Sequence, residues 1–80
     1  MQYDTIVSQA TPAGFSAIAV IRLSGPRSLQ IAKKLSKTKN NLSHGKPKVC
    51  PVFIKGENID QAVFIAYISP KSYTGENIVE

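Results

Sequence analysis

Hydrophobic and polar positions divide the chain into short extended segments around one amphipathic stretch. β-branched residues in Thr5–Ala10 predict a first strand, and the apolar run Ser16–Leu23 predicts a second. The connection between them is short enough for a hairpin, so we expect the two strands to be antiparallel. Because the second run is apolar on both faces up to Arg22, we expect it to be a central strand covered on both sides.

Helical spacing begins after Ser24-Gly25-Pro26, where Ser24 or Gly25 can cap a helix and Pro26 fits its first turn. We expect a helix from Pro26 to about Lys37. Its apolar stripe consists of Leu29, Ile31, Ala32 and Leu35. Lysines at its end favour the negative end of the helix dipole, which explains part of the basic cluster without a ligand.

The second half of the chain has a strand pattern. Lys48–Ile54 predicts a strand that lies at an edge or carries a bulge, because Pro51 has no backbone N–H to donate. Ala62–Ile68 is almost wholly apolar and pairs naturally with it as a hairpin. An extended segment begins at Asn77–Glu80, where the chain stops, so we expect a fragment of a longer domain. The fold class expected is α+β, a small mixed or antiparallel sheet with a helix packed on one face.

Composition narrows the kind of protein. The chain has 80 residues and a hydrophobic content of 42%, which is too high for a disordered segment. Its longest apolar run is far shorter than the roughly 20 residues of a membrane span. With no basic leader at the N-terminus, we expect a cytoplasmic protein without membrane contact. Cys50 and His44 are single residues of their types, so we expect neither an internal disulfide nor a zinc site, and a buried Cys50.

Charge is unevenly distributed along the chain. The net charge is +5, and no Asp or Glu occurs between Thr5 and Gly56. A basic half can contact phosphates such as those of tRNA, whereas a solvated lysine-rich face is the simpler explanation. No aromatic residue lies among the lysines of residues 33–39, so a platform for stacking bases is not indicated.

Motifs for catalysis are absent from the sequence. It contains no Gly-x-x-x-x-Gly-Lys-Ser/Thr segment, which is the loop that cradles nucleotide phosphates. With a single histidine, a nucleophilic triad is not supported either. We therefore expect no catalytic residue in this chain.

Two segments are distinctive. Residues 4–26 contain Asp-Thr-Ile, Ala-Thr-Pro-Ala-Gly and Ile-Arg-Leu-Ser-Gly, and residues 70–80 contain Ser-Tyr-Thr-Gly-Glu-Asn followed by Glu80. Together they resemble the N-terminal domain of the tRNA modification GTPase family called MnmE or TrmE. The departures are Ala13, Phe15-Ser16 and Asn77, where that family has Pro, Arg-Gly and Asp.

The resemblance implies that residues 1–80 are a partial N-terminal folate-binding and dimerisation domain, similar to folate-binding modules of the aminomethyltransferase type. The helical and GTPase domains of the family are absent. It implies a 5-formyl-tetrahydrofolate-type cofactor, a homodimer and the flavoprotein partner MnmG, also called GidA. The full enzyme modifies the wobble uridine of tRNA, and GTP, Mg²⁺ and K⁺ belong to its GTPase domain. Enzyme activity is therefore expected only of the full-length protein.

The family's folate contacts map onto Arg22 and Glu80, with Tyr73 as a further pocket residue. A carboxylate such as that of Glu80 can accept the adjacent N–H and amino groups of a reduced pterin. Arg22 can stack on the ring or bond a carbonyl or carboxylate, and the reverse assignment of roles stays open. The alternatives are that Arg22 pairs with a sheet neighbour, that Glu80 is a solvated terminus and that Tyr73 caps the core.

Two other functions fit the same sequence. The acid-free stretch is compatible with a small basic RNA-binding module, whose affinity would fall steeply with salt. A purely structural dimerisation module would form a dimer that responds to neither folate nor tRNA. The helix stripe and the apolar strands fit all three functions equally.

Overall fold

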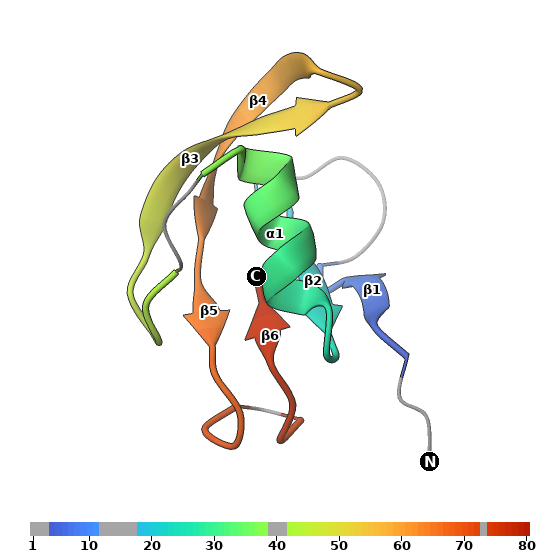
Figure 1. Ribbon diagram of the computed structural model, residues 1–80, viewed down its shortest axis with the longest axis vertical. Coiled ribbons are helices and arrows are strands. Elements are labelled where there is room, and N and C mark those ends of the chain that lie inside the picture. The colour runs from blue at the N-terminus through green and yellow to red at the C-terminus, as the bar shows by residue number, and fades with distance from the viewer. Residues whose placement is uncertain (1–3, 12–17, 39–41, 73) are drawn as a thin grey trace.

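The computed structural model describes residues 4–11, 18–38, 42–72 and 74–80. The elements in chain order are β1 (Ile6–Gln9), β2 (Ile21–Ser24), α1 (Ser28–Ser36), β3 (Lys48–Ile54), β4 (Glu57–Phe64), β5 (Ala66–Tyr67) and β6 (Ile78–Val79). One helix and antiparallel strands confirm the expected α+β class (Figure 1). Tyr73 and the predicted beginning of the second strand lie outside the described residues.

The strands form a four-stranded sheet in the order β1-β2-β6-β5 and a two-stranded sheet of β3 and β4. The expected β1–β2 hairpin is confirmed, with Val7 opposite Leu23. The apolar segment Ala62–Ile68, expected as one strand, is divided between the two sheets. Its first part completes β4, and Ala66 and Tyr67 leave that hairpin to pair with β6.

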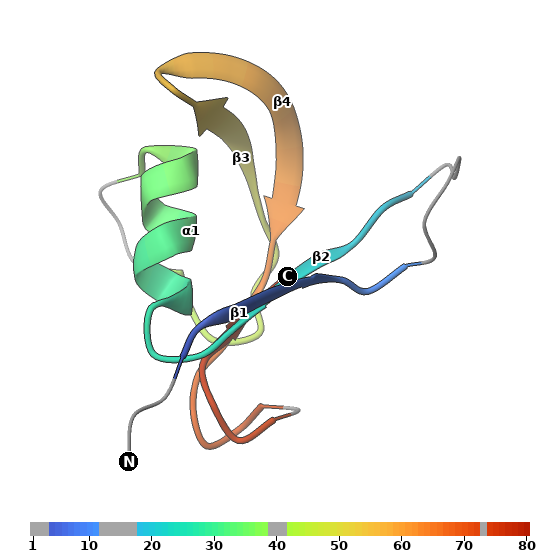
Figure 2. The same cartoon turned by 90° about the vertical axis from the view of Figure 1, so that its right-hand side faces the viewer.

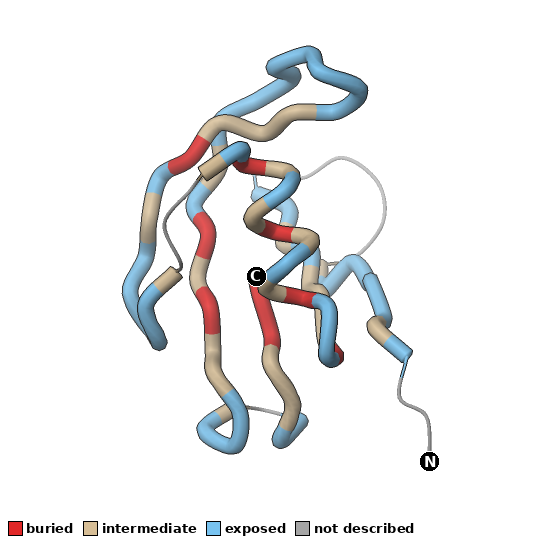
Figure 3. The backbone as a smooth tube through the Cα atoms, viewed as in Figure 1, coloured by how far each residue is buried: buried red, intermediate tan, exposed pale blue. Residues whose placement is uncertain are grey.

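The core lies between α1 and the two sheets. Figure 3 shows the buried positions where α1 faces β5 and β6, and an exposed tip on the β3–β4 hairpin. The buried hydrophobic cluster consists of Ala32, Cys50, Phe64, Ala66 and Val79. Cys50 is 3% exposed and is a free cysteine, which confirms the prediction that it is a small buried apolar residue.

The β1–β2 hairpin projects beyond the helix, as Figure 2 shows. β2 lies inside the sheet, between β1 and β6, as predicted for a central strand. The expectation that it is covered on both sides is wrong, because Ile18 and Ile21 are 73% and 51% exposed. α1 packs against β3 and β6 and so reaches only the part of β2 around Leu23, which packs against the core.

The helix begins at Ser28, two residues later than predicted. Its N-cap position is Arg27, which makes no side-chain capping bond, so capping by Ser24 or Gly25 was wrong. The buried Ser28 hydroxyl instead contacts two backbone carbonyls, those of Gly25 and Asn77, each at 2.9 Å. The start of α1 is thereby joined to the residue before β6. At the other end, Lys37 adopts a left-handed conformation that stops the helix.

The β3–β4 hairpin confirms both expectations for its proline. With only two strands in this sheet, Pro51 lies in an edge strand, and the register shifts between Val52 and Phe53. The Nζ of Lys37 lies 4.3 Å from the centre of the Phe53 ring, so the end of α1 contacts the hairpin. No helix in the described parts of the chain is long and apolar enough to cross a membrane.

Candidate ligand site between strands β2 and β6

Arg22 and Glu80 are 58 residues apart in sequence and form an ion pair in the structure. β2 runs antiparallel to β6 with Leu23 opposite Val79, so the next residue on each strand brings Arg22 beside Glu80. The Nε of Arg22 lies 2.8 Å from Oε2 of Glu80, and its Nη2 lies 2.5 Å from the same oxygen. The strand register therefore assembles the two residues that the sequence selected as candidates.

The two faces of this sheet differ in what they contact. Because side chains alternate along a strand, Leu23, Ala66 and Val79 share the face that packs on the core around α1. The opposite face carries a pocket of about 240 Å³. Its lining residues are Arg22, Tyr67, Ile78 and Glu80. The pocket therefore combines an ion pair with an aromatic ring and the aliphatic side chain of Ile78, which is only 1% exposed.

Glu80 is held by its backbone as well as by its side chain. Its N–H donates to the carbonyl of Ile65 and its carbonyl accepts from the N–H of Ile65, both at 2.8 Å. The alternative of a solvated terminus is therefore wrong. The other alternative, that Arg22 pairs with a sheet neighbour, is confirmed, and such pairing does not prevent either residue from contacting a ligand.

The ion pair leaves binding capacity on the carboxylate. Both bonds that Arg22 donates to Glu80 go to Oε2, and no side chain among the residues that the structure describes bonds Oε1 of Glu80. The side chains of Arg22 and Glu80 are 33% and 23% exposed. A partly exposed ion pair of this kind contributes about 1 kcal/mol or less to stability. The pair is therefore accessible to a ligand and has an acceptor atom to offer it.

Sequence reasoning missed Tyr67 and Ile78 as pocket residues. The available signal was alternation, because Ile78 lies two residues before Glu80 and must share its face. Tyr67 follows from its position opposite Ile78. That pairing could not be seen while residues 62–68 were interpreted as one strand of a different hairpin. Tyr73, the third residue selected from the sequence, lies outside the described residues.

Hydrogen bonds to the end of β2 and to the residues after β5 anchor the loop before β6. The Ser24 hydroxyl at the end of β2 contacts Oγ1 of Thr74 at 3.0 Å and Oε2 of Glu76 at 3.2 Å. The Asn77 side-chain oxygen accepts a bond of 2.7 Å from the N–H of Ser69, just after β5. These contacts fix the direction in which the chain enters β6, and with it the position of Glu80.

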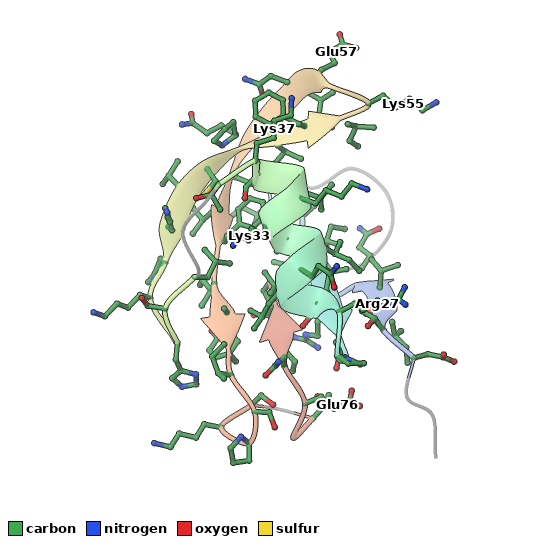
Figure 4. The ribbon with its side chains drawn as sticks, viewed as in Figure 1. Arg27, Lys33, Lys37, Lys55, Glu57 and Glu76 are labelled. Carbon is green, nitrogen blue, oxygen red and sulfur yellow. The ribbon has the colours of Figure 1, made fainter. Side chains whose placement is uncertain are left out.

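Charged side chains elsewhere do not converge on a second site in the views shown. Figure 4 shows Arg27 at one end of α1 and Lys37 at the other, with Lys33 between them and Lys55 on the β3–β4 hairpin tip near Glu57. Within the described ranges, no three His, Cys, Asp or Glu side chains are close enough to hold a metal ion. The Arg22–Glu80 pocket is therefore the candidate site that the geometry favours.

The fold and the pocket define a small α+β module with a candidate ligand site on the sheet face opposite its core. Residues 5–80 match the family model described as GTP-binding protein TrmE N-terminus, and the chain belongs to this family.

Full-length relatives agree with this assignment. The chain is 48% identical over 77 residues to the tRNA modification GTPase MnmE of Thermotoga petrophila, which covers 96% of the chain and 17% of the relative. It is 40% identical over 85 residues to the protein of the same name from Caldicellulosiruptor saccharolyticus, covering 100% of the chain and 19% of the relative. The chain thus spans less than a fifth of the length of these curated relatives.

Proposed function

We propose that this chain supplies the N-terminal part of a tRNA modification GTPase that acts on the wobble uridine of tRNA. In this proposal it binds a 5-formyl-tetrahydrofolate-type cofactor and contributes to a homodimer. GTP hydrolysis with Mg²⁺ and K⁺ belongs to a GTPase domain outside these 80 residues, and the flavoprotein MnmG acts with the full-length protein. The observation that carries the cofactor proposal is the Arg22–Glu80 pair in a pocket, with Oε1 of Glu80 unbonded by the described side chains.

The donor and acceptor groups of the pocket suit a reduced pterin. Such a ring presents an N–H and an amino group side by side, and a carboxylate can accept both in strong charge-assisted bonds. Glu80 fills that role, while Arg22 offers a planar cation that can stack on the ring or bond its carbonyl group. Tyr67 and Ile78 supply the apolar contact that the ring faces require.

The pocket volume limits how much of the cofactor it can hold. At about 240 Å³ it is smaller than the roughly 300–1,000 Å³ of pockets that enclose a drug-sized ligand. We therefore assign the pterin ring system to this pocket, with the remainder of the cofactor outside it. When bound, a folate of this kind supplies a one-carbon unit, and the residues of this chain bind and orient it.

Calorimetric titration with 5-formyl-tetrahydrofolate tests the cofactor proposal. We expect saturable binding by the unaltered chain and at least about tenfold weaker binding by Arg22→Ala, because a charge-assisted bond contributes about 1.5 to 3 kcal/mol. Arg27→Ala is the matched control, because Arg27 is exposed and bonds Thr5 through its backbone N–H. Absence of binding by the folded chain, or equal binding by Arg22→Ala, would overturn the proposal.

The observation that supports a homodimer is the position of strand β1 at an edge of the four-stranded sheet. Ile6 and Val7 on this strand are 62% and 64% exposed, and an exposed apolar edge strand readily pairs with another chain. We expect sedimentation to give a dimer for the unaltered chain and a monomer for Val7→Lys. Ile59→Lys, at a position of β4 that is 54% exposed, is expected to remain dimeric. A monomer at all concentrations of the unaltered chain would contradict dimerisation.

The alternative of a small basic RNA-binding module has weaker support. Its basis is the acid-free stretch of the sequence, but Figure 4 shows Lys33 on α1 and Lys55 at the tip of the β3–β4 hairpin, and Lys37 packs over the Phe53 ring. A nucleic-acid groove needs cations aligned along one path. RNA binding that falls steeply with salt and is indifferent to folate would favour this alternative.

A further inference from the structure

His44 and Gly45 protect the outer edge of β5. Ile65 and Glu80 bond each other across β5 and β6, so the backbone groups of Ala66 and Ile68 point away from β6. The N–H of Gly45 donates to the carbonyl of Ala66 at 2.7 Å. The N–H of Ile68 donates to Nδ1 of His44 at 2.8 Å. A backbone group and an imidazole therefore satisfy two successive groups of this strand edge.

The strand segment held in this way contains the aromatic residue of the pocket. Tyr67 lies between Ala66 and Ile68 and lines the pocket with Arg22 and Glu80. Its ring packs edge-to-face on the His44 ring, with the centroids 6.1 Å apart and an angle of 85° between the planes. His44 thus contacts the Tyr67 side chain and holds the backbone after it, at Ile68, while Gly45 holds the backbone before it, at Ala66.

The bond from Ile68 makes Nδ1 of His44 an acceptor. A backbone N–H can donate to Nδ1 only when that nitrogen carries no hydrogen, which places the ring hydrogen on Nε2. A side chain without an acceptor at this position would leave the N–H of Ile68 without this bond.

We infer that His44 is a positioning residue for the proposed cofactor pocket, holding Tyr67 in place through the bond from the N–H of Ile68 and the contact between the two rings. This inference rests on the proposed function, because it concerns ligand binding in the same pocket. Loss of the acceptor at residue 44 releases the edge of β5, loosens Tyr67 and weakens binding of the ligand.

Two variants separate the hydrogen-bond acceptor from the imidazole ring. Oδ1 of asparagine is as many bonds from the backbone as Nδ1 of histidine, so His44→Asn keeps an acceptor without the ring. His44→Ala removes the acceptor. Without ligand, we expect the hydrogen-exchange protection factor of the Ile68 amide to fall roughly three- to tenfold in His44→Ala and to be retained in His44→Asn.

Affinity for 5-formyl-tetrahydrofolate supplies the second readout. We expect it to weaken by roughly the same three- to tenfold in His44→Ala and to weaken less in His44→Asn. Unchanged Ile68 protection in His44→Ala, or unchanged affinity in that variant, would overturn the inference. If protection responds as expected but no form binds the folate, the proposed function fails, whereas the bond that holds β5 is confirmed.

Discussion

Replacing Gly25 with alanine is expected to destabilise the fold by about 3 to 4 kcal/mol, from backbone strain and overpacking together. Gly25 has a φ of +138°, which side chains rarely allow. A Cβ at this position would lie 2.6 Å from Cα of Thr5 and 2.7 Å from the carbonyl oxygen of Asp4. Because these are backbone atoms, they cannot move aside without separating β1 from the start of α1, where the Thr5 hydroxyl accepts a bond from the N–H of Arg27.

Urea or thermal unfolding measures this effect, and Gly45→Ala is the matched control. Gly45 also has a positive φ, +69°, but a Cβ there would meet no atom within 4 Å. Its replacement therefore reports conformational strain alone, which we expect to cost about 1 kcal/mol. For a domain of this size, each kcal/mol lowers the melting temperature by about 4 to 8 °C. Equal losses in the two variants would show that the close packing at Gly25 is not what the structure indicates.

Reversing the charge of Arg22 is expected to abolish folate binding and to destabilise the fold by about 2 kcal/mol. In Arg22→Glu, two carboxylates face each other where the structure has an ion pair with bonds of 2.5 and 2.8 Å. The double variant Arg22→Glu with Glu80→Arg restores opposite charges at the two positions. It is expected to recover most of the stability without recovering affinity for the folate. The carboxylate then lies on β2 and the guanidinium lies beside β6, so each group is in the place that the ligand requires of the other.

This double exchange separates the structural role of the pair from ligand recognition. Unfolding by urea reports the first role, and calorimetric titration with 5-formyl-tetrahydrofolate reports the second. Full recovery of affinity in the double variant would contradict the roles assigned to Arg22 and Glu80. Failure to recover stability would show that the pair depends on contacts other than charge.

Local patterns in the sequence were enough to predict most of the elements. Pro51 indicated an edge or bulged strand because the reason is local: it lacks an N–H. The β1–β2 hairpin followed from two apolar runs close together. The lysines in the last turn of α1 indicated where the helix ends, because cations favour the negative end of the helix dipole. The motifs around Arg22 and Glu80 indicated the family and selected the two residues that the structure brings together.

Features that depend on distant contacts could not be predicted. The start of α1 at Ser28 involves the carbonyl of Asn77, which lies 49 residues away. The division of residues 62–68 between two sheets depends on β6, and an almost continuous apolar run does not reveal its partners. Tyr67 was missed as a pocket residue for this reason. The exposure of Ile21 was missed because the run does not show where the helix stops covering the strand.

Nuclear magnetic resonance with 5-formyl-tetrahydrofolate tests the central claim most directly, because it locates the ligand on the folded chain. The account predicts saturable shifts of the Arg22 Nε–H signal and of the Tyr67 and Ile78 amides. It predicts no shift at Val49 or Val63, which lie exposed on the β3–β4 hairpin. Shifts confined to that hairpin, or a folded chain whose pocket signals do not respond, would contradict the claim that the face between β2 and β6 binds the cofactor.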